Sequence, residues 1–246
     1  MDKTNCSLYE QGRFREAAGA EFRPGGLPLT QELAEDCALQ PGESVLDLGC
    51  GVGSTASFLA REFGVSVVGL DSSRLFIQEA QARDPQVRWV LGSAREIPFP
   101  DCSFDVVFSE CFLSGLDDAG SVLREIRRVL RPCGRLAVTD LYLRAPSSDR
   151  PARLAPPATC LRGATGKDQT VESLALSGFA VRVWRDRSDA LAALMASLIF
   201  AYGSVAAFWE AAGAEPGVEE ALRAERPGYY LLIAQPNAET REAHRG

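Results

Sequence analysis

One short run holds the residues whose types and spacing could do chemistry, Asp-Leu-Gly-Cys-Gly-Val-Gly at positions 47–53. Glycines let the backbone approach a ligand closely, and a helix that starts after the run offers free N–H groups. The spacing is Gly-x-Gly-x-Gly, whereas a dinucleotide-binding loop would need a glycine at Ser54. Asp47 suits a ligand that carries an ammonium group better than a pyrophosphate. The run therefore predicts a ligand-binding loop, with a plain strand-to-helix turn as the alternative.

A second carboxylate, Asp71, follows the apolar run 65–70. At the end of a strand, its oxygens could accept hydrogen bonds from the two hydroxyls of a ribose. Alternatively, Asp71 caps the helical pattern that begins at Leu75, a role that Ser72 or Ser73 could share. Asp71 is thus predicted to bind a ligand, to cap a helix, or to do both.

Apolar runs alternate with helical patterns over the first 141 residues. We expect strands at 44–48, 65–70, 87–91, 105–109 and 135–141, and helices at 30–39, 54–63, 75–82 and 119–130. Thr30 would cap the first helix. Such alternation predicts a parallel sheet that binds ligands at the carboxyl ends of its strands. Farther on we expect a loop at 144–157, a helix at 171–176, a strand at 179–184, helices within 190–212 and a last strand at 229–234.

The composition narrows the function classes. The 33 acidic and 26 basic residues give a net charge of −7, which disfavours general nucleic-acid binding, and 246 residues suit one α/β domain. The single histidine, His244, argues against a Ser–His–Asp hydrolase and a multi-histidine metal site. Seven cysteines occur without a Cys-x-x-Cys pair, and the polar N-terminus lacks a signal-peptide core. We therefore expect reduced thiols, a cytoplasmic protein and no metal.

Residues 190–209 form a stretch of twenty residues without a charge, long enough to span a bilayer. Its large side chains make a helical stripe, and the opposite face is alanine-rich, which suits a helix packed on a domain or a subunit contact. We expect a helix, or two helices broken at Gly203-Ser204, with no membrane span. A homodimer through residues 190–212 is the expected assembly, if the protein is not a monomer.

Residues 40–141 resemble a known family, the class I S-adenosylmethionine-dependent methyltransferases of type 11. The resemblance is carried by four blocks in order: VLDLGCGVG (45–53), VVGLDSS (67–73), GSAREIPFPDCSFDVVFS (92–109) and LREIRRVLRPCGRLAVTD (123–140). These look like the nucleotide-binding motif, the ribose-binding strand end, the adenine site, and a helix with the fifth strand. The resemblance implies an α/β, Rossmann-like fold: a mostly parallel seven-stranded sheet, helices on both faces and a helical insertion before the last strand.

The resemblance also implies one methyltransferase domain over residues 1–246. Its parts would be an N-terminal arm and helix (1–40), a cofactor-binding core (41–141), an acceptor-side loop (142–169) and the helical insertion (185–228). The cofactor would be S-adenosylmethionine, and the partner would be a small-molecule methyl acceptor.

Roles for individual residues follow from the resemblance alone. The implied cofactor-binding set is Asp47, Gly49, Cys50, Gly51, Gly53, Asp71, Ser72, Ser93, Ala94 and Ser109. Asp47 would hold the methionine amino group, Asp71 the ribose hydroxyls, and the backbone N–H of Ala94 an adenine nitrogen. Glu110, with Ser109, would border the methyl that is transferred, and is a candidate catalytic residue.

Three departures from the family pattern affect the expected chemistry. Ser93 stands where relatives usually have aspartate, and Ser114 and Gly115 stand where they often have histidine. Cys133 replaces a glycine in a turn. Without a histidine, a general base would be Glu110, Asp140 or a cysteine, and it is needed only if the nucleophile starts protonated.

Cys160 begins a Cys-x-x-Gly-Ala run that resembles one in arsenite methyltransferases, where the matching cysteine binds trivalent arsenic. Thiolates bind soft centres well. Arsenic capture uses further cysteines, and here these could only be Cys6, Cys37, Cys50, Cys102 or Cys111. Cys160 is therefore a candidate catalytic residue or a packing cysteine. Its sulfur, if functional, should face the cofactor edge of the sheet and lie partly exposed, because a thiolate needs solvent or a positive neighbour to form.

Four functions remain open. The leading one is methyl transfer to a small molecule. A metalloid methyltransferase that uses Cys160 and a non-catalytic S-adenosylmethionine-binding protein are the alternatives within the family. A nicotinamide-dependent oxidoreductase is disfavoured because the third glycine of its loop is missing and Asp47 is present.

Overall fold

The computed structural model describes residues 14–16, 19, 23–147 and 159–237. Its centre is a seven-stranded sheet with the order β3-β2-β1-β4-β5-β7-β6. The strands are β1 (Ser44–Leu48), β2 (Ser66–Asp71), β3 (Arg88–Leu91), β4 (Phe104–Glu110), β5 (Leu130–Leu143), β6 (Phe179–Asp186) and β7 (Pro227–Pro236). Only β7 runs antiparallel to its neighbours. The predicted fold class, a mostly parallel seven-stranded sheet, is confirmed.

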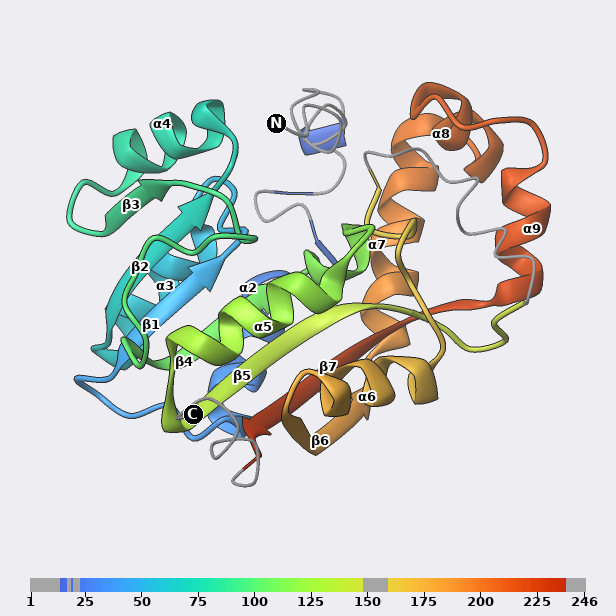
Figure 1. The fold of residues 1–246 in the computed structure, drawn as a ribbon. Helices are drawn as coiled ribbons and strands as arrows, with labels where there is room; N and C mark the ends of the chain where they lie inside the picture. The colour runs from blue at the N-terminus through green and yellow to red at the C-terminus, as the bar shows by residue number, and fades with distance from the viewer. Residues whose placement is uncertain (1–13, 17–18, 20–22, 148–158, 238–246) are drawn as a thin grey trace.

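Helices cover both faces of this sheet (Figure 1). They are α2 (Gly26–Asp36) and α3 (Ser54–Phe63) behind it, α5 (Ala119–Val129) and α6 (Lys167–Leu176) in front, and α4 (Arg74–Arg83) beside β2 and β3. One buried cluster joins the sheet to the rear helices through residues such as Leu33 and Ala56. The other joins it to the front helices through Ile126 and Leu174. Apolar side chains therefore pack on both faces, as long parallel strands require.

The first described helix of the core begins earlier than the pattern predicts. α2 starts at Gly26, and Pro28 lies in its first turn, where a missing N–H costs nothing. Thr30 is consequently inside the helix and fully buried, so the prediction that it caps the helix is wrong. Its hydroxyl points instead toward Glu110 of β4, at 3.2–3.3 Å from the carboxylate.

The insertion between β6 and β7 holds three helices, α7 (Ser188–Tyr202), α8 (Val205–Ala211) and α9 (Val218–Glu225). The predicted break is confirmed: Gly203 ends α7 with a φ of 89°, and the Ser204 hydroxyl accepts a hydrogen bond from the backbone N–H of Ala207 to begin α8. Within the described part of the chain, no single helix is long and apolar enough to cross a membrane. The pair α7 and α8 passes that test of length and composition together, with a bend of 78° between them.

Fifth-strand and loop boundaries also differ from the prediction. β5 starts at Leu130 and reaches Leu143, because its pairing with β4 shifts register between Phe104 and Val106 and admits the 131–134 turn into the strand. Most of the predicted 144–157 loop lies outside the described residues. The division of the chain into arm, core, acceptor-side loop and insertion stays a prediction.

Two neighbouring side chains of α7 should differ sharply in their effect on stability. Leu198 is 2 % exposed and Phe200 is 93 % exposed. Leu198→Ala is expected to lower the free energy of unfolding by about 2–5 kcal/mol, because it leaves a cavity in the core. Phe200→Ser should change it by less than about 0.5 kcal/mol in a monomer. Urea unfolding followed by circular dichroism measures both. A concentration-dependent loss with Phe200→Ser would instead place this face in the predicted homodimer contact.

Candidate functional site

The glycine run connects β1 to α3 and lies at the carboxyl end of β1. Gly49, Gly51 and Gly53 all have positive φ, at 76°, 52° and 84°. A Cβ at Gly49 would come within 2.6 Å of the Phe112 ring, and one at Gly53 would collide with Trp89, so packing alone requires both glycines. A Cβ at Gly51 would meet nothing within 4 Å. The loop is therefore packed from behind and open in front of Gly51, which leaves room for a ligand.

Asp71 holds this loop in place. Its Oδ2 accepts a hydrogen bond from the Gly51 N–H at 2.9 Å, and its Oδ1 accepts one from the Ser73 N–H at 2.8 Å. Ser73, and not Asp71, caps α4, because its hydroxyl accepts from the Phe76 N–H at 3.3 Å. Ser72 lies exposed between them. The carboxylate that the sequence assigns to a ribose is thus positioned beside the open face of the glycine loop.

Asp47 is a buried carboxylate that lacks a full set of partners. It is 2 % exposed, and its Oδ2 has no hydrogen-bond partner among the described residues. Burial, with a smaller contribution from the nearby Glu110, raises the pKa of Asp47 to about 8, while Arg23 opposes the shift. Buried polar atoms are nearly always hydrogen-bonded, so an orphaned carboxylate oxygen indicates a missing cationic or hydrogen-bond-donating partner.

A second orphaned atom lies on the neighbouring strand. Asp47 pairs in register with Phe108, and Ser109 follows one residue later. Ser109 is fully buried, and its hydroxyl likewise has no partner in the described part of the chain. Because side chains alternate along a strand and Asp47 is in register with Phe108, the Asp47 carboxylate and the Ser109 hydroxyl point to opposite faces of the sheet, so each orphaned atom marks its own face of the carboxyl edge.

The remaining predicted cofactor residues lie along the same edge. Cys50 is buried within the glycine loop, and burial raises the pKa of its thiol well above the ordinary value. Ser93 and Ala94 follow the end of β3; Ser93 is exposed and accepts from the Arg95 N–H at 3.2 Å, and Ala94 is partly buried. Because β1 to β4 are parallel, the carboxyl ends that carry the predicted set all meet at one edge of the sheet.

Glu110 has partners that the sequence did not indicate. It lies 2.9 Å from the guanidinium of Arg23, with which it forms a buried ion pair, and it accepts from the hydroxyl of Thr55 at 2.6 Å. The hydroxyls of Thr30 and Thr139 lie at 3.2–3.3 Å. These contacts tie α2, α3, β4 and β5 together. A catalytic role for Glu110 stays a prediction, and the ion pair argues for a structural one.

Arg23 itself carried no functional signal in the sequence, where Arg-Pro-Gly-Gly indicates only a turn. In the structure it is 7 % exposed and also donates to the hydroxyl of Thr55 at 2.9 Å. A buried arginine is found only where acceptors satisfy it. No local pattern could have revealed this one, because its carboxylate partner comes from a distant strand.

Asp140, another candidate base, anchors a turn. It is fully buried, and burial raises its pKa to about 6 against the effect of several hydrogen bonds. Its Oδ2 accepts from the Ser114 N–H at 2.9 Å, and its Oδ1 accepts from the Ser114 hydroxyl. The turn η1 (Leu113–Gly115) is thereby fixed to β5. Ser114, which stands where relatives often have histidine, thus has a structural partner.

Cys160 lies at the cofactor edge, as predicted for a functional cysteine, but it is buried, whereas the prediction requires a partly exposed sulfur. Its Sγ is 3.1 Å from the Sγ of Cys111, the residue that follows β4, and 2.9 Å from the Cys111 carbonyl oxygen. Cys160 is 6 % exposed and Cys111 is partly buried. Among the described residues, no group of three or more His, Cys, Asp or Glu side chains could hold a metal ion. The structure therefore brings together two sulfurs, Cys111 and Cys160, and not the three of a three-sulfur metalloid site.

Residues 14–16 cross above the carboxyl edge (Figure 1). Phe14 packs against Phe208 of α8, with ring centroids 6.3 Å apart, and Arg15 forms an ion pair with Glu79 of α4. The segment thus connects the insertion on one side to the helix beside β2 and β3 on the other.

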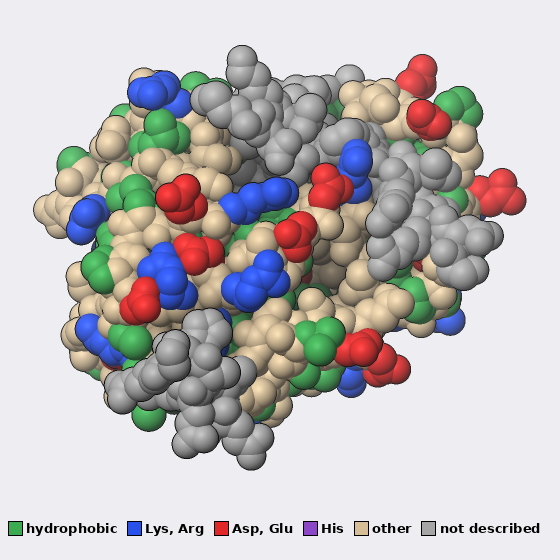
Figure 2. All heavy atoms as spheres, viewed as in Figure 1, with side chains coloured by type: hydrophobic (Ala, Val, Ile, Leu, Met, Phe, Trp, Pro, Cys, Tyr) green, Lys and Arg blue, Asp and Glu red, His purple; other side chains and the backbone are tan. Residues whose placement is uncertain are grey.

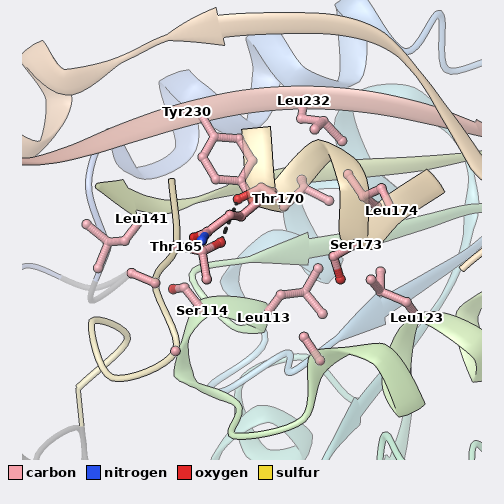
Figure 3. Close-up of a pocket in the computed structure, with 15 residues that line it drawn as sticks. Leu113, Ser114, Leu123, Leu141, Thr165, Thr170, Ser173, Leu174, Tyr230 and Leu232 are labelled. Carbon is pink, nitrogen blue, oxygen red and sulfur yellow. Dashed lines mark hydrogen bonds between the residues drawn. The ribbon is translucent and has the colours of Figure 1, made fainter. Parts of the chain in front are cut away.

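A separate cavity of about 310 Å³ lies on the front face, between α5, α6, β5 and β7 (Figure 3). Its wall is mostly apolar, with the hydroxyls of Thr165 and Thr170 bonded to each other at 3.0 Å. Ser114 is one lining residue, but none of the predicted cofactor residues lines the cavity. The cavity and the glycine loop are therefore distinct features.

Comparison with known proteins agrees with this geometry. Residues 46–138 match the family described as a methyltransferase domain. Over these residues the chain is similar to the methyltransferase domain family. The predicted resemblance to class I methyltransferases is confirmed. The matched residues run from within β1 to within β5 and include the glycine loop, Asp71 and Glu110.

The curated relatives are similar to about half of this chain. An O-methyltransferase, resE of Aspergillus sclerotiorum, is 37 % identical over 123 residues, which are 48 % of this chain and 47 % of the relative. The chain spans about half the length of the curated relatives it matches. Among solved structures, the [4+2]-cyclase SpnF is 28 % identical, with a TM-score of 0.64 over 85 % of this chain and 81 % of the other.

A second solved structure matches the fold over a longer stretch. The phosphoethanolamine N-methyltransferase 2 of Haemonchus contortus, in complex with S-adenosyl-L-methionine, has a TM-score of 0.73 at 20 % identity. The match covers 92 % of this chain and 56 % of that one. The similarity in fold therefore extends well beyond residues 46–138.

Proposed function

We propose that this protein is an S-adenosylmethionine-dependent methyltransferase that acts on a small molecule. The observation that carries the proposal is the orphaned Oδ2 of Asp47, buried beside a glycine loop whose front is open at Gly51. The family match and the fold support it. A nicotinamide dinucleotide offers no primary ammonium group to satisfy this carboxylate.

The chain's residues fit the cofactor one by one. Asp47 would hold the methionine ammonium, whereas the Ser109 hydroxyl faces the other side of the sheet and its role stays a prediction. Asp71 would bind the ribose hydroxyls while it keeps its bond to the Gly51 N–H. Ala94, at the end of β3, would meet the adenine. Bound there, the sulfonium supplies a methyl group that is already activated for displacement.

The protein's share of the chemistry is orientation and exclusion of water. Methyl transfer needs the nucleophile, methyl carbon and sulfur in line, and it gains most from fixed geometry in a dry site. Residues 14–16, held by Phe208 and Glu79, are suited to cover the site. A base is needed only for a protonated acceptor, and Asp140, whose pKa is raised to about 6, is the candidate that could accept a proton near neutral pH.

The acceptor class is a further proposal. One relative is named as an O-methyltransferase and one structural neighbour as an N-methyltransferase of phosphoethanolamine, so the domain serves more than one acceptor atom. We place the acceptor near the 142–169 and 185–228 segments, which the family match does not include. On the face shown in Figure 2, basic and acidic side chains are interspersed, which supports a small molecule over a nucleic acid. The cytoplasmic location stays a prediction.

A thiophilic acceptor, such as trivalent arsenic, is the second candidate. The observation that favours it is the second sulfur that the fold brings to Cys160, at 3.1 Å. Cys160→Ser should then abolish transfer to arsenite and leave S-adenosylhomocysteine affinity unchanged. Transfer to arsenite by the serine variant, or none by the wild type, removes this candidate. The non-catalytic alternative predicts cofactor binding without methyl transfer to any acceptor in a broad panel.

Binding titration tests the main proposal directly. We expect the wild-type chain to bind S-adenosylmethionine and S-adenosylhomocysteine saturably, and not NAD. Asp71→Ala should weaken S-adenosylhomocysteine binding by about 1–3 kcal/mol, because a charge-assisted contact is lost and the glycine loop loses its support at Gly51. Asp84→Ala, at the other end of α4, is the matched control and should bind as the wild type does. Saturable NAD binding without a response to S-adenosylhomocysteine would overturn the proposal.

A further inference from the structure

The two cysteines at the carboxyl edge are held together by more than their own contact. The Gly163 N–H donates to the Ser114 carbonyl at 2.7 Å, and a Cβ at Gly163 would collide with that backbone. The Cys111 N–H donates to the Thr139 carbonyl at 2.7 Å, which ties it to β5. The segments 111–116 and 159–163 are therefore packed backbone to backbone. Their two thiols are positioned before any reaction.

The separation of the sulfurs distinguishes between two kinds of site. Two sulfurs that share a tetrahedral zinc, each about 2.3 Å from the metal, lie about 3.8 Å apart. The Cys111 and Cys160 sulfurs are 3.1 Å apart, closer than that and about 1 Å longer than a disulfide bond. A small approach of one side chain would bring them to bonding distance. The geometry is thus nearer to a disulfide than to a metal site.

We propose that Cys111 and Cys160 form a modification site, a thiol pair that a small-molecule disulfide converts into an intramolecular disulfide. Cys111 is the more exposed residue of the two and meets the oxidant first. The contact with the Cys160 sulfur and burial raise the pKa of its thiol well above the ordinary value, so its thiolate forms more readily as pH rises. Its thiolate attacks one sulfur of glutathione disulfide, forms a mixed disulfide and releases one glutathione. The thiolate of Cys160 then attacks the Cys111 sulfur and releases the second glutathione. The protein loses two protons and two electrons, and one glutathione disulfide becomes two glutathione thiols.

The bond would link two parts of the site. Cys111 precedes Phe112, whose ring lies against Gly49 of the cofactor loop. Cys160 belongs to the predicted acceptor-side loop, residues 142–169. The disulfide would fix that segment to the end of β4 and close a loop over a sequence separation of 49. The inference needs only the two sulfurs and does not rest on the proposed methyl transfer.

Peptide mapping of the full-length protein tests the proposal. A background with Cys6→Ser, Cys102→Ser and Cys133→Ser removes two exposed thiols and the one outside the described residues. After treatment with glutathione disulfide and alkylation, we expect most molecules to carry a Cys111–Cys160 cross-linked peptide. Cys37 is the internal control: it is buried, donates to the Ala34 carbonyl, and should remain an alkylated thiol after denaturation.

The cross-link should also raise thermal stability. By constraining the unfolded chain it should raise Tm by roughly 4–12 °C, a rise that dithiothreitol reverses. Cys111→Ser and Cys160→Ser, each in the same background, should show neither cross-link nor rise. Full alkylation of Cys111 and Cys160 after oxidation would overturn the proposal. So would a rise in Tm that persists in either single-serine variant.

Discussion

Asp47→Asn is expected to weaken S-adenosylhomocysteine binding by about 2–3 kcal/mol and, at the same time, to stabilise the ligand-free protein. The binding loss follows because a buried charge-assisted contact to the ammonium is removed. The gain in stability follows because the carboxylate is 2 % exposed with an orphaned oxygen, and an amide of the same shape costs less to bury. Function and stability therefore oppose each other at this residue.

The gain in folding stability from Asp47→Asn should increase with pH. Burial raises the folded-state pKa of Asp47 to about 8, whereas the unfolded value is about 4. Between these values the folded chain binds more protons, so its stability falls as pH rises, by up to about 1.4 kcal/mol per pH unit. In Asp47→Asn no carboxyl group titrates at this position, so the variant should lack the decrease in folding stability that Asp47 causes as pH rises. The variant and the wild type should be equally stable near pH 4 and should differ increasingly up to pH 8.

Asp105→Asn is the matched control because its shift has the opposite sign. Asp105, at the amino end of β4, accepts from the Ser44 N–H at 2.9 Å and pairs with Arg131, and these contacts lower its pKa although burial opposes them. Its neutralisation should reduce stability above pH 4 and leave ligand binding unchanged. Urea unfolding from pH 4 to 8, with isothermal titration, measures both variants. Equal ligand affinity in Asp47→Asn and the wild type would refute the role of Asp47.

Proton release gives an independent check on Asp47. If the ammonium of the ligand pairs with this carboxylate, binding at pH 7 must drive a largely protonated Asp47 to ionise. Titrations of S-adenosylhomocysteine in buffers of different ionisation enthalpy should then show nearly one proton released by the wild type. Asp47→Asn should release fewer. A wild type that releases no proton at pH 7 would mean that Asp47 is already ionised or does not pair with the ligand.

Glu110→Gln is expected to lower the free energy of unfolding by about 3–5 kcal/mol. Its carboxylate forms a buried ion pair with Arg23 at 2.9 Å, and loss of one partner leaves the other charge buried without compensation. Arg23→Met should cost a similar amount. The double variant Arg23→Met with Glu110→Leu should cost less than the sum of the two single changes, because no isolated charge remains.

The same variants separate a structural Glu110 from a catalytic one. In a structural role, Glu110→Gln loses stability, but below its Tm it retains turnover within about tenfold, whereas loss of a general base costs about 10²–10⁴-fold. Glu125→Gln is the control, because Glu125 pairs with Arg128 near the surface and should cost under about 1 kcal/mol. Wild-type stability with abolished turnover in Glu110→Gln would restore the catalytic assignment.

The sequence by itself determined the features that depend on residues close together in the chain. The apolar runs predicted five parallel strands whose ends lie within five residues of the observed ones, and the ends of β1 coincide, because a buried strand must be apolar on both faces. The glycine loop, with Asp47 before it and Asp71 at the end of the next strand, was predicted from spacing alone. Gly203-Ser204 likewise predicted the break in the insertion, since a positive φ and a capping hydroxyl are local requirements.

Only the tertiary structure decided which of those residues have partners. Glu110 and Asp47 are both acids at strand ends, yet the fold gives one an arginine from before α2 and leaves an oxygen of the other unpaired. Cys111 and Cys160 are 49 residues apart and carry no shared pattern, but packing of two turns brings their sulfurs to 3.1 Å. Burial and long-range contact set the charge, the pKa and the reactivity of a side chain, and neither can be read from its neighbours in sequence.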